Sequence, residues 1–385
     1  MPFLKSALLC LLVVSAGVFA EKESTVIVIS MDGVRHDISE NNDLDAFKRM
    51  EKNGVRAEYL IPVYQSTTYP AHVSLATGVY PDKHGILHNS FFDKVKGRFS
   101  YDADANWLDV PPIWVLAEQQ NIRSAVFFWV GSETNWNNIG ASYRKAPFDA
   151  SIKEEVKIEQ ILNWLDMNDE QRPRLIMSYW DGTDELAHQQ GPISDDISQQ
   201  MARQNKLLTS LLSEIDKREA WDYVTIFVVS DHGMTAVNNY INLKGLLYES
   251  RIAARLSEGP AVSHLFLKEE DVDNAFQFFK SQPHIIAFKK EDLPETWRMN
   301  HPTRTGDIIL ATEAPNMFSS YGRPNGMHGY SPDMNDMHAI FYGMGAGIKP
   351  QQLGPVHQVD LMPTISKILG IKIPHAIDGK ALDLN

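Results

Sequence analysis

Near the start of the chain stands the stretch Thr25-Val26-Ile27-Val28-Ile29-Ser30-Met31-Asp32-Gly33. Its β-branched, apolar residues follow one another without polar alternation, which is typical of a strand buried on both faces of a parallel sheet. In such sheets the functional side chains lie just beyond the carboxyl ends of the strands. Asp32 holds that position here, although Asp-Gly after a strand is also an ordinary turn signal.

Similar apolar runs recur farther along the chain and alternate with segments of helical spacing. This alternation predicts an α/β fold with a mainly parallel central sheet sandwiched by helices. Residues 235–305 are more mixed and predict a small insertion or cap, within one elaborated domain that spans residues 21–385. The further strands are expected at residues 124–129, 175–180, 223–230, 307–311 and 339–342, and the helices at residues 44–52, 113–120, 152–165, 195–216 and 359–369.

The composition is that of an ordinary acidic globular protein. The 385 residues are 43% hydrophobic and 22% charged, which excludes a generally disordered chain and a fibrous repeat. Forty-nine acidic residues against 36 basic ones give a net charge of −13, which argues against specific or non-specific binding of nucleic acid.

The first twenty residues have the pattern of a secretory signal peptide. Lys5 is followed by an apolar stretch at residues 7–16 and by the small-residue cleavage site Val18-Phe19-Ala20. The apolar stretch is too short to span a bilayer, and no later run is comparable, so no transmembrane anchor is expected. Cys10, the only cysteine, lies inside this signal. We therefore expect a periplasmic or secreted protein, more typical of bacteria than of animals, without disulfides or a thiol nucleophile.

Metal-binding side chains follow two more of the predicted strands. Asp231 and His232 come directly after the strand at residues 223–230. Asp184 and His188 follow the strand at residues 175–180, and their spacing of four places both on one face of a helical turn, which suits two ligands of one metal. The same spacing also occurs in plain surface ion pairs. His328 stands among turn residues and indicates little by itself.

Thr68 is a candidate nucleophile. It precedes Tyr69 and Pro70 at the start of a helical pattern that runs to about Thr77, and proline suits the first turn of a helix. Thr68 could simply cap this helix. As a nucleophile its hydroxyl would need both a metal and the helix N-terminus to stabilise the alkoxide.

Taken together, these side chains predict a two-metal site. Six nitrogen or oxygen ligands without a thiolate fit two divalent ions, with zinc favoured. Two ions about 4 Å apart can activate a nucleophile and stabilise both the attacking and the leaving oxygen at phosphorus.

Five motifs in order identify a resemblance to a known family. They are Ser30-Met31-Asp32-Gly33, Thr68-Tyr69-Pro70 with Thr77-Gly78-Val79-Tyr80-Pro81-Asp82-Lys83-His84-Gly85, Asp184-x3-His188-x2-Gly191-Pro192, Ser230-Asp231-His232-Gly233-Met234, and His328-Gly329-Tyr330. From about residue 25 to its end, the chain resembles the nucleotide pyrophosphatase/phosphodiesterase family of the alkaline phosphatase superfamily. It lacks the extra modules of the large animal members and looks like a free-standing catalytic domain.

The resemblance implies an alkaline-phosphatase-like fold, two zinc ions and a covalent phospho-threonine intermediate. It assigns one zinc to Asp184, His188 and His328. It assigns the other to Asp32, Asp231 and His232, with Thr68 as the reactive ligand. Asn89 matches the family asparagine that donates to a non-bridging phosphate oxygen, as an oxyanion-hole group does.

Substrate contacts are also implied by the resemblance. Tyr69 stands where the family places an aromatic ring against the nucleobase, and Trp129 and Tyr143 would form the other wall of that pocket. Trp129 could instead end a core strand. Asp102 aligns with a lysine that contacts the base in some animal members, so the resemblance sets no base preference.

The predicted reaction is hydrolysis of a nucleotide phosphodiester or pyrophosphate bond that releases a nucleoside 5′-monophosphate. Related hydrolases of the superfamily are the alternatives: a phosphomonoesterase, a phosphonoacetate hydrolase or a phosphodiesterase for choline-type lipid head groups. A non-catalytic binding protein on the same scaffold would be expected to lack a metal ligand or Thr68, and both are retained.

Overall fold

The computed structural model describes residues 22–38, 43–319 and 322–385. The predicted signal peptide, residues 1–20, lies outside the described residues. Among the helices of the described ranges, none combines the length and the apolar character needed to cross a bilayer.

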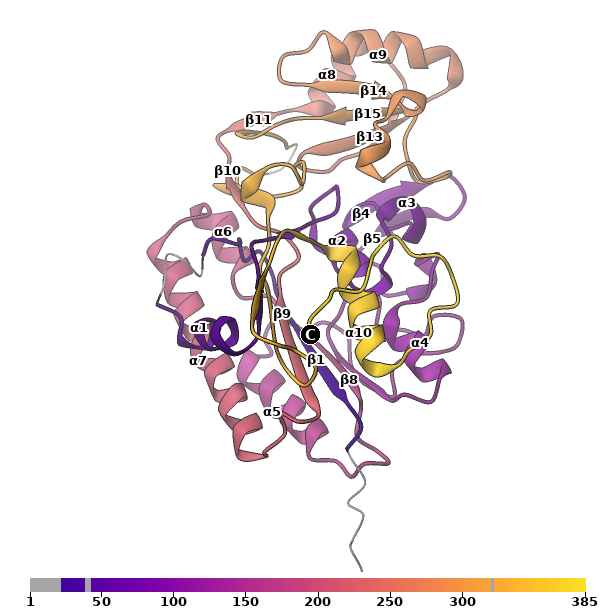
Figure 1. The fold of residues 1–385 in the computed structure, drawn as a ribbon. Helices are drawn as coiled ribbons and strands as arrows, with labels where there is room; N and C mark the ends of the chain where they lie inside the picture. Colours follow the sequence, from indigo (N-terminus) through magenta and orange to yellow (C-terminus); the bar gives the residue numbers. More distant parts are fainter. Residues whose placement is uncertain (1–21, 39–42, 320–321) are drawn as a thin grey trace, which may run out of the picture.

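The core of the molecule is an eight-stranded sheet that is mainly parallel, as predicted (Figure 1). β1 lies at its centre and pairs in parallel with β8 on one side and with β9 on the other. Only β18 runs antiparallel to both of its neighbours. In spatial order the strands are β19 (Gln351–Leu353), β2 (Val55–Ala57), β18 (Phe341–Gly345), β9 (Val224–Val229), β1 (Thr25–Met31), β8 (Leu175–Trp180), β6 (Ser124–Phe127) and β7 (Tyr143–Lys145).

Helices cover both faces of this sheet, so its central strands are fully buried. One apolar cluster joins the sheet to α1 (Asp45–Asn53), α5 (Glu154–Leu165) and α7 (Asp195–Lys217). A second cluster joins the other face to α2 (Thr68–Thr77), α4 (Ile113–Gln119) and α10 (Leu361–Leu369). Because helices cover both faces, the side chains on either side of each central strand are apolar, and the strands show no alternation of polar and apolar residues.

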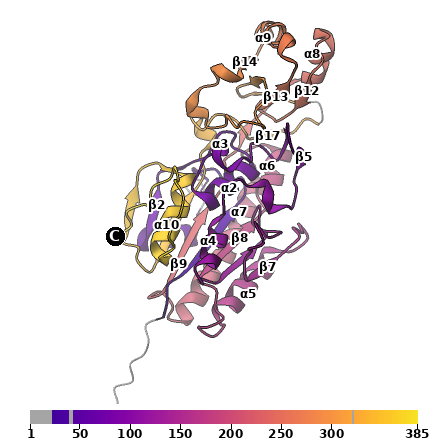
Figure 2. The same cartoon turned by 90° about the vertical axis from the view of Figure 1, so that its right-hand side faces the viewer.

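A smaller cap stands over the end of the sheet toward which β1 runs (Figures 1 and 2). It is built on a four-stranded antiparallel sheet with its own apolar cluster. Its strands, in spatial order, are β12 (Arg255–Ser257), β13 (Val262–Phe266), β15 (Ile308–Ala311) and β14 (Ile286–Lys289), and its helices are α8 (Leu243–Ser250) and α9 (Val272–Lys280).

Several short elements lie outside the two main sheets. They are β3 (Leu60–Ile61) with β20 (Val356–His357), α3 (Pro81–His84), the hairpin β4 (Ser90–Asp93) and β5 (Gly97–Ser100), α6 (Asp184–Gln190), β10 (Thr235–Ala236) with β17 (Gly326–Met327), and β11 (Asn239–Ile241) with β16 (Asn316–Phe318).

Three expectations about strands need correction. The run at residues 307–311 forms β15, which belongs to the cap and not to the central sheet, so the cap sheet extends past residue 305. The run at residues 339–342 forms β18, which is antiparallel. The strand expected at residues 124–129 ends at Phe127, because Phe128 adopts a positive φ of 66° that turns the chain out of the sheet.

Candidate active site

Three neighbouring strands bring the predicted acidic residues to one edge of the sheet. β1 is paired with β8 up to Met31 opposite Trp180, and with β9 up to Ser30 opposite Val229. Asp32 follows β1 directly, Asp184 begins α6 after β8, and Asp231 with His232 follows β9. Because the carboxyl ends of parallel strands meet at one edge, side chains far apart in sequence lie together here.

The ligating atoms form two groups that share His232. Asp32, Asp231 and His232 make one group, as the resemblance implies, and Asp184, His232 and His328 make the other. His232 Nε2 lies 3.2 Å from Asp231 Oδ2 and 3.5 Å from Asp32 Oδ1. The rings of His232 and His328 are stacked, with centroids 3.6 Å apart.

His188 lies at the open side of the second group. Its Nε2 is 3.3 Å from Asp184 Oδ2, while His328 Nε2 is 3.7 Å from Asp184 Oδ1. Asp184 therefore lies between the two histidines that the resemblance assigns to the same metal. The six predicted ligands are all present at one site.

Each of the three histidines uses one ring nitrogen in a hydrogen bond to the backbone, which leaves the other nitrogen available to bind a metal. The Nδ1 atoms of His188, His232 and His328 each lie 2.9 Å from a backbone carbonyl, those of Gly326, Gly233 and Ser66 respectively. A ring nitrogen that donates to a carbonyl fixes the tautomer, so the lone pair resides on Nε2, which faces the carboxylates. This arrangement is characteristic of histidines that bind metal.

The carboxylates are crowded and incompletely partnered. Asp32 Oδ1, Asp184 Oδ1 and Asp231 Oδ2 are buried and have no hydrogen-bond partner in the described residues. Burial, reinforced by the carboxylates of Asp231 and Asp184, raises the pKa of Asp32 well above its ordinary value. Because a cation would both satisfy these oxygens and offset the repulsion, the residues present fit divalent metals.

Thr68 lies next to these ligands at the N-terminus of α2. It is the first residue of the helix, as predicted, and follows the N-cap residue Thr67, whose side chain makes no capping hydrogen bond. Thr68 Oγ1 lies 3.5 Å from His232 Nε2. The positive end of the helix dipole therefore points at the oxygen that is expected to carry negative charge.

Asn89 lies beside Thr68 and lines the same pocket. Its Oδ1 accepts a hydrogen bond of 2.9 Å from the backbone N–H of Tyr69. That bond fixes which end of the side chain is the amide nitrogen, and leaves the NH₂ group as a donor near Thr68. The geometry suits a contact to a phosphate oxygen.

The pocket beside the candidate metal ligands measures about 600 Å³ and has an aromatic wall. The ring of Tyr69 packs edge-on against Tyr101, with centroids 5.2 Å apart. Phe128 and Phe148 form another edge-on pair at 5.3 Å. A cavity of this size with aromatic sides can hold a planar group such as a nucleobase.

Of the two other predicted pocket residues, Trp129 lines the cavity and Tyr143 does not. Trp129 borders the pocket although its side chain is fully buried, and its indole N–H donates to the carbonyl of His72. Tyr143 begins β7 and pairs with Ala125, away from the carboxyl edge, and its hydroxyl donates to the Gln171 carbonyl. The structure does not bring Tyr143 to the pocket, because its strand starts at the opposite end of the sheet.

Sequence reasoning missed two residues that support the site from below. Tyr179 donates a hydrogen bond to Asp32 Oδ2 at 2.5 Å. His72 is buried, with Nδ1 2.8 Å from the Thr68 carbonyl and Nε2 2.9 Å from Ser30 Oγ. His72 stands four residues after Thr68, on the same helical face, and that spacing was a signal that could have indicated it.

Comparisons with known proteins indicate the family of this chain. The family model described as type I phosphodiesterase/nucleotide pyrophosphatase matches residues 26–331. An uncharacterised pyrophosphatase/phosphodiesterase of Schizosaccharomyces pombe is 30% identical over 380 residues, which cover 91% of this chain and 77% of that protein. Human bis(5′-adenosyl)-triphosphatase is 27% identical, covering 92% of this chain and 80% of its own length.

Solved structures show the same likeness. An inactive variant of murine ectonucleotide pyrophosphatase/phosphodiesterase 5, in complex with AMP, is similar to this chain with a TM-score of 0.86 and 26% identity. The match covers 92% of this chain and 98% of that one. The human counterpart gives a TM-score of 0.85 at the same identity, covering 91% of this chain and 96% of its own.

Proposed function

Because this chain belongs to the type I phosphodiesterase/nucleotide pyrophosphatase family, and is therefore a hydrolase of phosphodiester or pyrophosphate bonds, we propose that it releases nucleoside 5′-monophosphates through a phospho-threonine intermediate. The observation that carries the proposal is the position of Thr68, at a helix N-terminus and 3.5 Å from a ring nitrogen of the ligand group.

Two zinc ions are proposed as the cofactors. Asp184, His188 and His328 would hold one of them, and Asp32, Asp231 and His232 the other. When bound, such ions lower the pKa of a coordinated hydroxyl and screen negative charge around phosphorus. The mixed set of carboxylates and imidazoles, without thiolates, supports zinc over magnesium or calcium.

The chain's own residues account for the remaining steps. The Thr68 hydroxyl loses its proton to solvent, and the helix N-terminus stabilises the negative charge on Oγ1. Oγ1 then attacks phosphorus in line, and the P–O bond to the leaving group breaks, so that the leaving oxygen departs and takes up a proton from water. The Asn89 amide donates to a non-bridging phosphate oxygen as charge accumulates there. Water then attacks the phospho-threonine, which releases the 5′-monophosphate and restores the hydroxyl. Tyr69 would stack against the base.

The test is the kcat/KM of the zinc-loaded protein for the 4-nitrophenyl ester of AMP against 4-nitrophenyl phosphate. Both substrates release the same phenol, so a difference in kcat/KM reflects only the second substituent on phosphorus, which is adenosine in the diester and absent in the monoester. We expect a diester preference of roughly 10³ or more, about 4 kcal/mol in transition-state stabilisation. An equal or reversed preference would assign the protein to the phosphomonoesterases.

One observation favours a second substrate class. Besides the predicted ligands, the pocket is lined by carboxylates of Asp102, Glu133, Asp181 and Glu185 among its aromatic rings. Aromatic faces with nearby carboxylates attract quaternary ammonium groups. A phosphodiester with a choline-type head group is therefore the second candidate, and 4-nitrophenyl phosphorylcholine in the same assay distinguishes it from the nucleotide ester.

We also propose that residues 1–20 direct export and are removed, to leave a periplasmic or secreted catalytic domain at residues 21–385 with its insertion near residues 235–305. The composition of the first twenty residues supports the export signal.

A further inference from the structure

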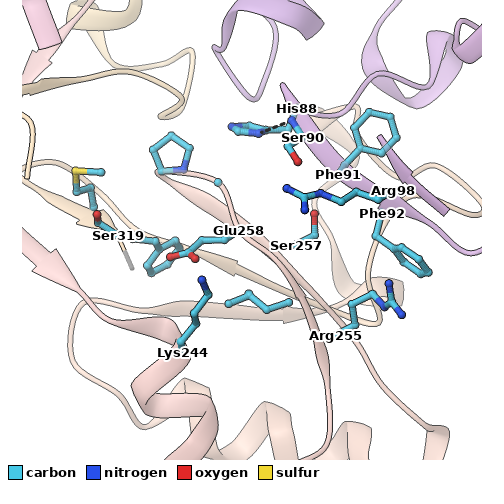
Figure 3. Close-up of a pocket in the computed structure, with 15 residues that line it drawn as sticks. His88, Ser90, Phe91, Phe92, Arg98, Lys244, Arg255, Ser257, Glu258 and Ser319 are labelled. Carbon is cyan, nitrogen blue, oxygen red and sulfur yellow. Dashed lines mark hydrogen bonds between the residues drawn. The ribbon is translucent and has the colours of Figure 1, made fainter. Parts of the chain in front are cut away.

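A second cavity, about 560 Å³ in volume, lies between the cap and the β4–β5 hairpin. Figure 3 shows its two walls: His88, Ser90 and Arg98 belong to the hairpin side, and Lys244 and Arg255 to the cap. Arg98 projects from the hairpin toward the cap segment that contains Ser257 and Glu258 (Figure 3). We call this cavity the cap groove.

The cap groove is cationic in an acidic protein. Its lining includes Arg98, Lys244 and Arg255, with Glu258 as the one carboxylate, while the whole chain carries a net charge of −13. Neither Arg98 nor Arg255 forms an ion pair with any residue of the described ranges. The Arg255 guanidinium lies 4.1 Å from the centroid of the Phe92 ring, which restrains it without neutralising its charge.

The two walls of the groove are fixed relative to each other by ion pairs. Arg304, whose side chain is 1% exposed, donates to Asp93 of β4 at 2.8 Å. Lys94 pairs with Asp307 at 2.7 Å. Because these pairs tie the hairpin to the segment that precedes β15, the spacing of the cations is set before a ligand arrives, which lowers the entropy cost of binding.

The cap groove borders the active site along one short segment. His88 and Ser90 line the groove, whereas Asn89 between them lines the catalytic pocket. This arrangement is expected because successive side chains of an extended chain point to opposite sides. Pro260 lines the groove and packs against Gly329, where an added Cβ would meet Pro260 and Thr67 at 3.1 Å each. The groove is therefore one residue layer from the segments that carry Thr68 and His328.

We propose that the cap groove binds a phosphate-rich anion. Guanidinium groups match the oxygens of phosphate in bidentate geometry, and two of them on opposite walls suit a chain of phosphates better than a single carboxylate. The anion is either the distal phosphates of a nucleotide whose reacting phosphorus lies at Thr68, or a free polyphosphate. Only the first source rests on the proposed function.

The test titrates inorganic pyrophosphate into the zinc-loaded protein by calorimetry, with saturating AMP in the catalytic pocket and a buffer that holds free zinc constant. We expect the wild type to bind pyrophosphate, and the Arg98→Gln/Arg255→Gln variant to bind it at least tenfold more weakly. Arg251→Gln is the matched control, since Arg251 is an exposed arginine of the cap that does not line the groove. We expect its affinity to stay within twofold of the wild type. Equal binding by all three proteins, or none by the wild type, overturns the proposal.

Kinetics with the same variants distinguish the two sources of anion. If the groove takes the substrate's own phosphates, the double variant loses at least tenfold in kcat/KM for ATP, mainly through KM, and keeps its value for the 4-nitrophenyl ester of AMP. If pyrophosphate binding is lost but both kcat/KM values are kept, the ligand is a free anion. If the wild type hydrolyses neither substrate, the proposed function fails, and the titration still decides the groove.

Discussion

Thr68→Ala is expected to lower the kcat/KM for nucleotide diesters by at least roughly 10⁴-fold, about 5 kcal/mol in activation free energy. The variant removes the oxygen that is proposed to form the covalent bond to phosphorus, 3.5 Å from His232 Nε2. The measurement is steady-state hydrolysis of the 4-nitrophenyl ester of AMP, with zinc content checked by elemental analysis. Thr68→Ser keeps a hydroxyl at the same place and should stay within about tenfold of the wild type.

Thr67→Ala is the matched control for this prediction. Thr67 is the adjacent threonine, is buried, and its hydroxyl has no hydrogen-bond partner among the described residues. Its replacement therefore changes the same helix start without touching the proposed chemistry, and activity should stay near the wild-type value. Turnover by Thr68→Ala equal to that of the wild type would exclude the covalent mechanism.

Removal of metal is expected to abolish activity and also to destabilise the fold. Among the described residues, Asp32, Asp184 and Asp231 have buried oxygens without hydrogen-bond partners, so the proposed ions would bind the native state and not the unfolded chain. Binding at 1,000 times the dissociation constant contributes about 4 kcal/mol of stability. Treatment with EDTA should therefore lower the melting temperature by several degrees as well as stop hydrolysis.

Restoration of the metal provides the control for that experiment. Elemental analysis should find two zinc ions per chain in the restored protein, and zinc should return both activity and melting temperature. Magnesium should not, because three of the six ligands are imidazole nitrogens, which magnesium binds poorly. Full activity in protein shown to be free of metal would rule out the two-metal site.

Much of the fold follows from local pattern. The apolar run before Asp32 has no polar alternation, so it had to be buried on both faces, and the structure confirms it as the central strand β1. The helix α2 begins at Thr68, where Pro70 in the first turn indicated it. The same pattern could not show to which sheet a strand belongs. Residues 308–311 are apolar like β1 but pair within the cap, because the choice of partner strand depends on contacts between residues far apart in the sequence.

The candidate site could also be predicted only in part from the sequence. Asp32, Asp184 and Asp231 could be predicted because each follows a strand, and parallel pairing brings strand ends together. The pocket was predicted in part, because Tyr69 and Trp129 line it whereas Tyr143 does not. Phe128 turns the chain with a positive φ, and it lines the pocket together with Phe148, which the sequence did not indicate. Tyr101 and Phe148 lie in loops, and the conformation of a loop cannot be predicted from a periodic pattern in the sequence.

The stereochemical course at phosphorus tests the central claim most directly. Hydrolysis of a phosphorothioate diester of known configuration in ¹⁸O-labelled water yields a chiral product whose configuration can be assigned. Attack by Thr68 followed by attack of water makes two in-line displacements, each of which inverts phosphorus, so the account predicts net retention. Net inversion would mean that water attacks the substrate directly, and would contradict the role assigned to Thr68.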